Sequence, residues 1–145
     1  MAKQANKSPG LWLFKQEPGC YAFDQLLADG KTVWDGVGNN TARLNLWKIA
    51  RGDRIMYYHT GKEKAVVGEA KVIKGPYVPK DSKDDKAVVV EIRAVKRWAN
   101  AVTLKRIKQE ADLADWELVR LPRLSVVPVT QEQWRKIEHM SQEDT

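Results

Sequence analysis

The sequence predicts an α+β fold in a single domain, with strands that pair mainly with their neighbours along the chain. Two β-type segments, residues 53–60 and 65–73, are separated only by the short segment 61–64, which predicts an antiparallel hairpin. The expected order of elements is strand, two helices, three strands, helix, strand and helix. Because helices do not separate every pair of strands, the order is not that of a regularly wound parallel sheet.

The N-terminal part of the domain begins with a buried strand. Residues 11–15 form an apolar run (LWLFK) that is typical of such a strand. Pro18 and Gly19 then predict a turn. Residues 22–30 predict a short helix that Gly30 ends, and its apolar side chains share one face: Phe23, Leu26 and Leu27.

A second helix is expected to begin at Asn39 and Asn40, whose side chains suit the N-cap position. Three apolar residues at helical spacing predict the face that packs on the core: Ala42, Leu46 and Ile49. Gly52 lies where a glycine commonly follows a helix, so we expect the helix to end there.

The C-terminal half contains the longest β-type run, residues 87–98 (AVVVEIRAVKRW). A helix is expected over residues 103–110. A strand follows over residues 124–129, where Pro128 favours an edge position because proline lacks an amide donor. Thr130 provides an N-cap for a final helix over residues 131–140, whose inward side chains are expected to be Trp134, Ile137 and Met140.

The composition is that of a globular domain, with 43% hydrophobic and 30% charged residues. We expect residues 1–10 to form a flexible lead and residues 11–145 to form the domain. No apolar run approaches the length of about 20 residues that a membrane helix needs, so no membrane partner is expected. Cys20 is the only cysteine, which excludes an internal disulfide and favours the cytoplasm, or the nucleus if the source is eukaryotic.

Positive charge is concentrated in the middle of the chain. The net charge is +6, and residues 71–108 alone hold 11 Lys and Arg against 4 Asp and Glu. A basic segment on a neutral-to-acidic background is typical of a protein that binds a polyanion such as nucleic acid. The alternative is that these lysines only solvate exposed strands.

The segment Gly36-Val37-Gly38 lies between a β-type start and a helix, as in a dinucleotide-binding turn. The third glycine of that motif would fall at Thr41, and the strand before it is short and polar. We therefore expect no nucleotide cofactor.

Metal and nucleophilic chemistry find little support in the sequence. One cysteine and two histidines show no spacing typical of metal ligands, so no metal is expected. No pattern identifies a catalytic residue, and we expect no enzymatic activity. An enzyme that acts on a nucleotide or base through Glu17, Asp35, His59 and Cys20 stays an alternative.

Aromatic residues are numerous, with six tryptophans and four tyrosines. We expect Trp12, Trp47 and Trp134 to be core residues. Trp34 directly precedes a loop rich in glycine and asparagine, so we expect its ring to face a cavity, where it could stack on a base taken out of its helix.

Five blocks of the sequence together resemble the EVE domain family. In order, they are WLFKQEP, TVWDGVGNNTAR, ARGDRIMYYHTG, AVVGEAKVIKGPYVP and RLSVVPVTQEQWRKI. The resemblance implies a PUA-like mixed β pseudo-barrel with flanking short helices. It also implies recognition of a modified nucleobase, with modified cytosine favoured, in DNA or RNA. A protein-interaction adaptor stays an alternative.

The resemblance further implies a ligand pocket with an aromatic and polar lining. Trp34 would stack on the base, while Asp35 and Asn39 would form hydrogen bonds with its edge. The complete set of expected site residues is Lys15, Glu17, Trp34, Asp35, Asn39, Tyr58, His59 and Tyr77. Alternation along a strand places Tyr58 with Thr60 and His59 with Tyr57, so Tyr58 and His59 cannot both point straight into one cavity.

Three positions in two segments differ from the common pattern of that family. Gly38-Asn39-Asn40 stands where many members carry Arg-Asn-Tyr, and Thr60 stands where they carry Ser. The missing arginine removes one potential contact with a phosphate or a base.

Overall fold

A computed structural model of the chain describes residues 9–84 and 86–142. Its centre is a six-stranded sheet in the order β2-β5-β4-β3-β1-β6. The strands are β1 (Leu11–Gln16), β2 (Lys31–Trp34), β3 (Arg54–His59), β4 (Ala65–Tyr77), β5 (Val89–Thr103) and β6 (Val126–Pro128). The helices are α2 (Pro18–Tyr21), α3 (Phe23–Asp29), α4 (Asn40–Trp47), α5 (Leu104–Lys108), η1 (Ala111–Leu113), α6 (Glu117–Arg120) and α7 (Gln131–Ser141). The predicted α+β class is confirmed.

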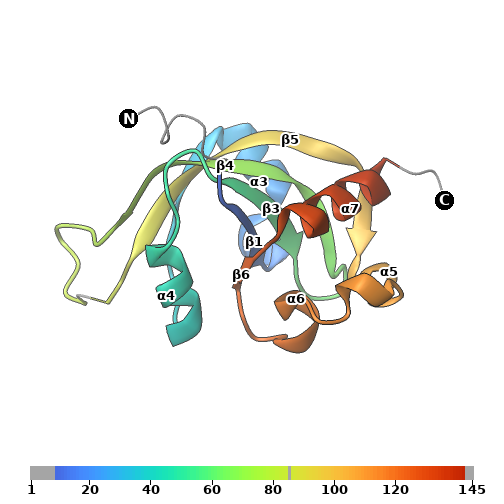
Figure 1. Cartoon of the computed structure of the whole chain (residues 1–145). Coiled ribbons are helices and arrows are strands. Elements are labelled where there is room, and N and C mark those ends of the chain that lie inside the picture. Colours follow the sequence, from blue (N-terminus) through green and yellow to red (C-terminus); the bar gives the residue numbers. More distant parts are fainter. Residues whose placement is uncertain (1–8, 85, 143–145) are drawn as a thin grey trace, which may run out of the picture.

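The sheet is mixed because β1 and β3 run parallel, whereas the other neighbouring strands run antiparallel. The predicted hairpin is confirmed as β3 and β4. The long β4–β5 pair contains several register shifts, and such irregularities increase the local twist of a sheet. Figure 1 shows β4 and β5 arching over the shorter strands, with α4 and α6 below them.

The predicted helix ends are mostly confirmed by their caps. Gly30 follows α3 with φ at 83°, which a glycine tolerates best. The Asn39 side chain accepts a hydrogen bond from the Ala42 amide, and Thr130 forms a capping box with Gln133. Trp134, Ile137 and Met140 are buried, as predicted.

Several expectations for the elements were wrong. The expected turn at Pro18 is the short helix α2, and residues 31–34 form an additional sheet strand between the two helices. Gly52 does not end α4, which stops at Trp47; it lies instead in the turn before β3, with φ at 96°. Residues 111–120 contain η1 and α6, which the sequence pattern did not predict.

The start of the domain is held by Asp53, which is buried. Its carboxylate accepts hydrogen bonds from the Gly10 amide, the Ala50 amide and the Trp12 indole at 2.8–3.0 Å. A β-carbon on Gly10 would lie only 2.6 Å from Asp53 Oδ2, so a side chain there would displace the carboxylate. Residues 1–8 of the expected lead lie outside the described residues, whereas Gly10 belongs to the packed domain. Among the described helices, none is long and apolar enough to cross a bilayer.

Candidate functional site

The parallel pairing of β1 and β3 brings two chain segments together at one edge of the sheet. Lys15 lies opposite Tyr58 and Gln16 lies opposite His59 in the strand register. The Thr60 amide continues the pairing by donating to the Gln16 carbonyl at 3.0 Å. Because parallel strands end at the same edge, the ends of two sequence blocks form one surface.

The connection between α6 and β6 closes this surface from a third side. The Lys15 ammonium donates to the Pro122 carbonyl at 2.8 Å, and the Lys15 amide donates to the Ser125 carbonyl at 2.9 Å. The buried Asn45 side chain donates to the Val126 carbonyl at 2.8 Å, which holds α4 against β6. Segments from β1, β3, α4 and the 121–125 connection are thereby fixed around one region.

The first cavity of this region, which we call the Lys15–Tyr58 cavity, has a volume of about 260 Å³. It is lined by Lys15, Tyr58, Thr60, Gly61, Lys64, Leu104, Lys108, Leu118, Val119 and Pro122. Glu17 is exposed near its rim, since a β-carbon on Gly61 would lie 3.3 Å from Glu17 Oε1. Tyr58 and Thr60 share this cavity, as strand alternation predicted.

Two polar residues that line the Lys15–Tyr58 cavity are buried to different degrees: Lys15 is partly buried, and Tyr58 is 3% exposed. The Lys15 ammonium lies 5.8 Å from the centre of the Tyr58 ring, and burial lowers the pKa of Lys15. Burial also raises the pKa of Tyr58 to about 12, so its hydroxyl is neutral at physiological pH. The Tyr58 hydroxyl has no hydrogen-bond partner among residues 9–84 and 86–142. It can therefore donate a proton to an incoming ligand.

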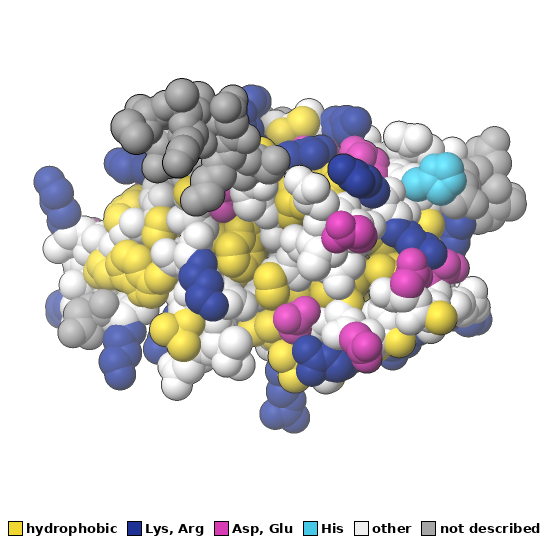
Figure 2. Space-filling view, viewed as in Figure 1, with side chains coloured by type: hydrophobic (Ala, Val, Ile, Leu, Met, Phe, Trp, Pro, Cys, Tyr) yellow, Lys and Arg dark blue, Asp and Glu magenta, His cyan; other side chains and the backbone are white. Residues whose placement is uncertain are grey.

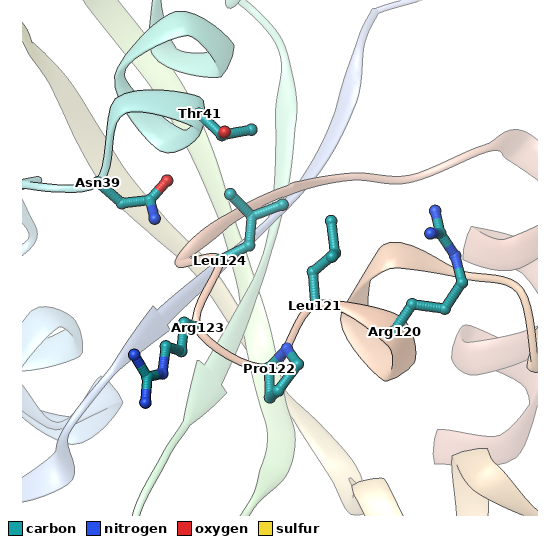
Figure 3. Close-up of a pocket in the computed structure, with 7 residues that line it drawn as sticks. All are labelled: Asn39, Thr41, Arg120, Leu121, Pro122, Arg123 and Leu124. Carbon is teal, nitrogen blue, oxygen red and sulfur yellow. The ribbon is translucent and has the colours of Figure 1, made fainter.

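The second cavity, the Asn39–Arg123 cavity, has a volume of about 310 Å³ (Figure 3). Its lining residues are Asn39, Thr41, Arg120, Leu121, Pro122, Arg123 and Leu124. Pro122 lines both cavities, so the two are neighbours. Asn39 Oδ1 caps α4, which leaves the amide nitrogen of the same side chain to contact a ligand.

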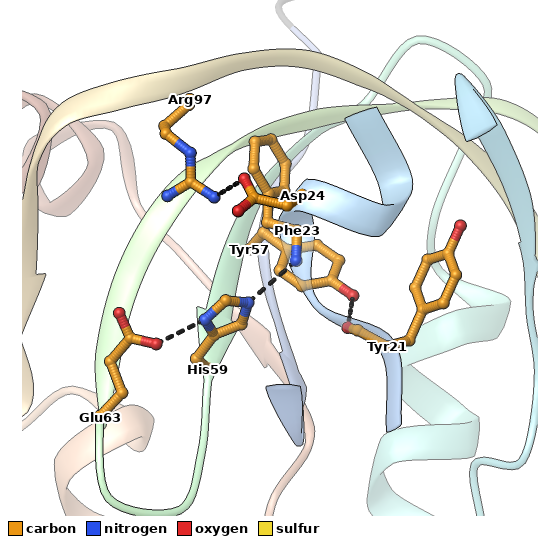
Figure 4. Close-up of polar contacts among 7 residues, drawn as sticks. All are labelled: Tyr21, Phe23, Asp24, Tyr57, His59, Glu63 and Arg97. Atoms are coloured by element: carbon orange, nitrogen blue, oxygen red, sulfur yellow. Dashed lines mark hydrogen bonds and ion pairs between the residues drawn. The ribbon is translucent and has the colours of Figure 1, made fainter. Parts of the chain in front are cut away.

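His59 lies on the other side of β3, away from the residues that line the two cavities. Figure 4 shows that both of its ring nitrogens are engaged: Nε2 accepts from the Phe23 amide at 3.0 Å, and Nδ1 is 2.6 Å from Glu63 Oε1. Its ring also packs edge-on against Tyr57. His59 thus links α3 to the hairpin. It has no ring nitrogen left for Cys20, which is exposed on α2.

Trp34 is a core residue, which corrects the expectation that its ring faces a cavity. Its exposed fraction is 4%, and its ring centre lies 5.2 Å from Phe14 and 5.5 Å from Tyr57. The cause is strand alternation, because β2 directs Val33 outward and Trp34 inward. The stacking face that the sequence suggested is covered by other aromatic rings.

Asp35 and Tyr77 are also separated from the two neighbouring cavities. Asp35 lines a third cavity of about 450 Å³, which we call the acidic cavity because Asp81 and Asp84 line it as well. Tyr77 ends β4, and its hydroxyl donates to Glu91 at 2.5 Å. That hydrogen bond, with partial burial, raises the pKa of Tyr77.

Four cations at the two cavities had not been assigned to the site from the sequence: Lys64, Lys108, Arg120 and Arg123. The signal that could have found the last two is the Arg-Leu-Pro-Arg segment at 120–123, a proline-containing loop between a helix and a strand. Figure 2 shows Asp and Glu side chains mostly over the half that carries α5 to α7, and Lys and Arg side chains around the whole margin.

Comparison with known proteins gives one consistent result. The EVE domain matches residues 10–140 of the chain. Human thymocyte nuclear protein 1 is 29% identical over an alignment that covers 85% of this chain and 70% of that protein.

Solved structures agree with this match. The NMR structure of a Rhodopseudomonas palustris protein is 39% identical with a TM-score of 0.86, covering 93% of this chain and 96% of that one. The crystal structure of human THYN1 protein in complex with DNA that contains 5-methylcytosine is 25% identical with a TM-score of 0.84, covering 94% and 99%. An ASCH protein of Zymomonas mobilis, 14% identical with a TM-score of 0.57 over 94% and 97% of the two chains, shares the fold alone. The predicted PUA-like fold is thereby confirmed.

Proposed function

The chain belongs to the EVE domain family, and we propose that it binds DNA that carries a modified base, with modified cytosine as the favoured class. The human relative in complex with 5-methylcytosine DNA supports this proposal, because the match covers 94% of this chain and 99% of that one. The excess of Lys and Arg over Asp and Glu is consistent with a polyanionic partner.

We place the base at the Lys15–Tyr58 cavity and the adjoining Asn39–Arg123 cavity. The observation that carries this placement is that Lys15 and Tyr58 line one cavity, where no described residue bonds the Tyr58 hydroxyl. Burial lowers the pKa of Lys15 and raises that of Tyr58. A base taken out of its stack is recognised by hydrogen bonds to its edge and by contacts with its faces. Tyr58 and Asn39 would read the edge, and Lys15 would interact with a base oxygen or nitrogen acceptor.

The phosphates that flank the base would contact the cations that line the two cavities: Lys64, Lys108, Arg120 and Arg123. Such contacts fix the position of the strand without reading its sequence. In this proposal Glu17 lies at the rim, whereas Trp34 and His59 stabilise the strands that carry the site.

We further propose that binding is not coupled to catalysis. Of the residues in the alternative enzyme, His59 uses both ring nitrogens inside the protein and Asp35 lines the separate acidic cavity. Within the described part of the chain, no group of three or more metal-ligating side chains is clustered. Incubation of the protein with nucleosides, nucleotides and phosphodiesters should leave them unchanged. Turnover that is lost in His59→Ala would contradict this proposal.

The binding proposal is tested with two duplexes that differ only in one 5-methylcytosine. We expect tighter binding of the methylated duplex. Tyr58→Phe keeps the ring and removes the hydroxyl, so the methylated complex should weaken by about 0.5–1.5 kcal/mol, the usual net contribution of a hydrogen bond.

Tyr57→Phe is the matched control, because the Tyr57 hydroxyl donates to the Tyr21 carbonyl inside the protein. That variant should retain the preference. Equal affinity of the wild-type protein for both duplexes would overturn the proposed ligand class, and an unchanged Tyr58→Phe would remove the proposed cavity.

A further inference from the structure

The outward face of α4 exposes two large apolar side chains. Leu44 is 62% exposed and Trp47 is 50% exposed. They form a stripe with Asn40 and Arg43 at the spacing of one helix face. Together with Lys86, from the connection between β4 and β5, this stripe lines a groove of about 390 Å³, which we call the Trp47 groove. The exposure of Trp47 corrects the expectation that it belongs to the core.

The Trp47 groove and the proposed site share one helix. Asn39 and Thr41, at the N-terminal end of α4, line the Asn39–Arg123 cavity, whereas Trp47 is the last residue of α4. From Asn39 to Trp47 the helix axis advances about 12 Å, given a rise of about 1.5 Å per residue. Successive phosphates of one strand of B-DNA lie about 3.4 Å apart along the axis. A strand that leaves the site along α4 would therefore reach Trp47 within a few nucleotides.

The charge around the groove favours a nucleic-acid strand over a protein helix. Both charged residues in its lining, Arg43 and Lys86, are cations. The Arg43 side chain is oriented by a hydrogen bond from its Nε to the Val37 carbonyl at 3.0 Å. Figure 2 shows mainly apolar and Lys or Arg side chains over the half of this face that carries α4.

Carboxylates restrict the path of such a strand. Arg43 also lines the acidic cavity, where Asp35, Asp81 and Asp84 would repel phosphate. A phosphate is therefore expected to approach Arg43 from the side of Leu44 and Trp47, away from these carboxylates. An exposed indole beside two cations is the combination that binds unpaired nucleotides, by stacking on a base and by phosphate contacts.

We propose that the Trp47 groove binds an unpaired nucleotide of the strand that flanks the recognised base. The base stacks on Trp47 with Leu44 against its edge, and Arg43 and Lys86 contact the phosphates. This inference rests on the proposed function, and it adds that the preferred partner contains a single-stranded segment next to the recognised position. A fully paired duplex cannot offer its bases to Trp47, because they remain stacked on each other.

The test compares two DNAs with the same central sequence, one a blunt duplex and one with a single-stranded extension of four nucleotides. The wild-type protein should bind the extended DNA more tightly. Trp47→Ala should weaken binding of the extended DNA by about 5- to 150-fold, the range for one base–aromatic stack, and should leave the blunt duplex unaffected. Trp47→Phe should retain part of the gain. Leu27→Ala removes an exposed apolar residue on α3 and is the matched control.

The outcomes separate this inference from the function on which it rests. Preference for the methylated duplex with no effect of Trp47→Ala would overturn the inference and leave the proposed function standing. If Trp47→Ala loses binding of the extended DNA but the wild-type protein shows no preference for methylation, the groove binds a nucleotide and the proposed recognition of a modified base is wrong. If Trp47→Ala binds DNA normally but abolishes self-association of the wild-type chain in sedimentation, the groove is a protein interface and the inference is wrong.

Discussion

Two tryptophans at the ends of one segment, Trp34 and Trp47, have opposite environments. Trp34 is 4% exposed and its ring is enclosed by Phe14 and Tyr57, whereas Trp47 is half exposed beside Arg43 and Lys86. They flank the segment that carries Asn39 and Thr41, which line the proposed site. The difference shows that an aromatic residue near a site can either support the fold or face the ligand. Which of the two it does depends on the face of the strand or helix that carries it.

The same division applies to the polar residues of β3. Tyr58 faces the Lys15–Tyr58 cavity with a hydroxyl that no described residue engages, while His59, its neighbour in sequence, is bonded on both ring nitrogens. The domain therefore contains one set of side chains that is fully engaged inside the protein, which we call the interior set, and a second set that lines cavities. Tyr58 belongs to the second set, although it is only 3% exposed. Substitutions in the first set should change stability, and substitutions in the second should change binding.

The largest expected effect separates the two tryptophans. Trp34→Ala removes a buried ring and should lower the free energy of unfolding by about 3–5 kcal/mol. Trp47→Ala removes an exposed ring and should change it by no more than about 0.5 kcal/mol. Chemical denaturation of both variants measures the difference. Similar losses in the two variants would contradict the division.

The next effect concerns His59, which bonds the Phe23 amide and the Glu63 carboxylate. His59→Ala leaves a buried amide without an acceptor and should cost about 1–3 kcal/mol of stability, the penalty for such a group. Glu63→Gln perturbs only the outer bond, at a side chain that is 44% exposed, and should cost less. If the folded His59→Ala protein binds modified DNA normally, His59 belongs to the interior set; loss of binding without loss of stability would move it to the site.

A smaller effect is expected for the surface cations. Lys108→Gln and Arg123→Gln should each reduce the slope of log affinity against log salt concentration by about 0.9, because each removes one phosphate contact. Lys136→Gln is the control, since its ammonium lies 2.8 Å from Glu110 and 3.0 Å from Asp112. Equal slopes in all three variants would show that the cations at the cavities do not contact phosphate.

The smallest effect is a dependence of stability on pH. Burial lowers the pKa of Lys15, so at pH values between its folded and its ordinary pKa the unfolded chain binds more protons than the folded chain. The contribution of Lys15 to the free energy of unfolding should therefore rise with pH through that interval. Subtracting the alkaline stability curve of Lys15→Met from that of the wild-type protein should isolate this rise. A difference that falls with pH would contradict the assigned burial.

Much of the fold could be predicted from the sequence because its signals are local. The caps at Asn39 and Thr130, the stop at Gly30 and the apolar spacing around Trp134 each act within one or two helical turns. The positions of Trp34 and Trp47 could not be predicted in the same way. They depend on which strand pairs with β2 and on which face of α4 packs against β6. Both are determined by contacts between segments that are distant in the sequence.

Some of the residues that the sequence assigned to a site lie close together in the structure. Lys15, Tyr58 and Asn39 do line neighbouring cavities, and strand alternation separated Tyr58 from His59 correctly. Asp35 lies elsewhere because residues 35–38 line the acidic cavity. Tyr77 lies elsewhere because its hydroxyl bonds Glu91 at the end of β4. The contribution of residues 120–123 was missed, since the contact of Pro122 with Lys15 spans 107 residues.

That long-range closure has a consequence for how the chain is synthesised. The β3–β4 hairpin needs only nearby residues and can form early. The β1–β3 pairing must first close a long loop, and the entropy lost in that closure slows pairing between distant strands. The contact of Lys15 with Pro122 needs an even longer loop. On the ribosome, the wall of the proposed site would be completed only after the 121–125 connection has emerged. Ligand binding can therefore serve as an assay for a fully translated and folded chain, and an incomplete nascent chain should not compete for DNA.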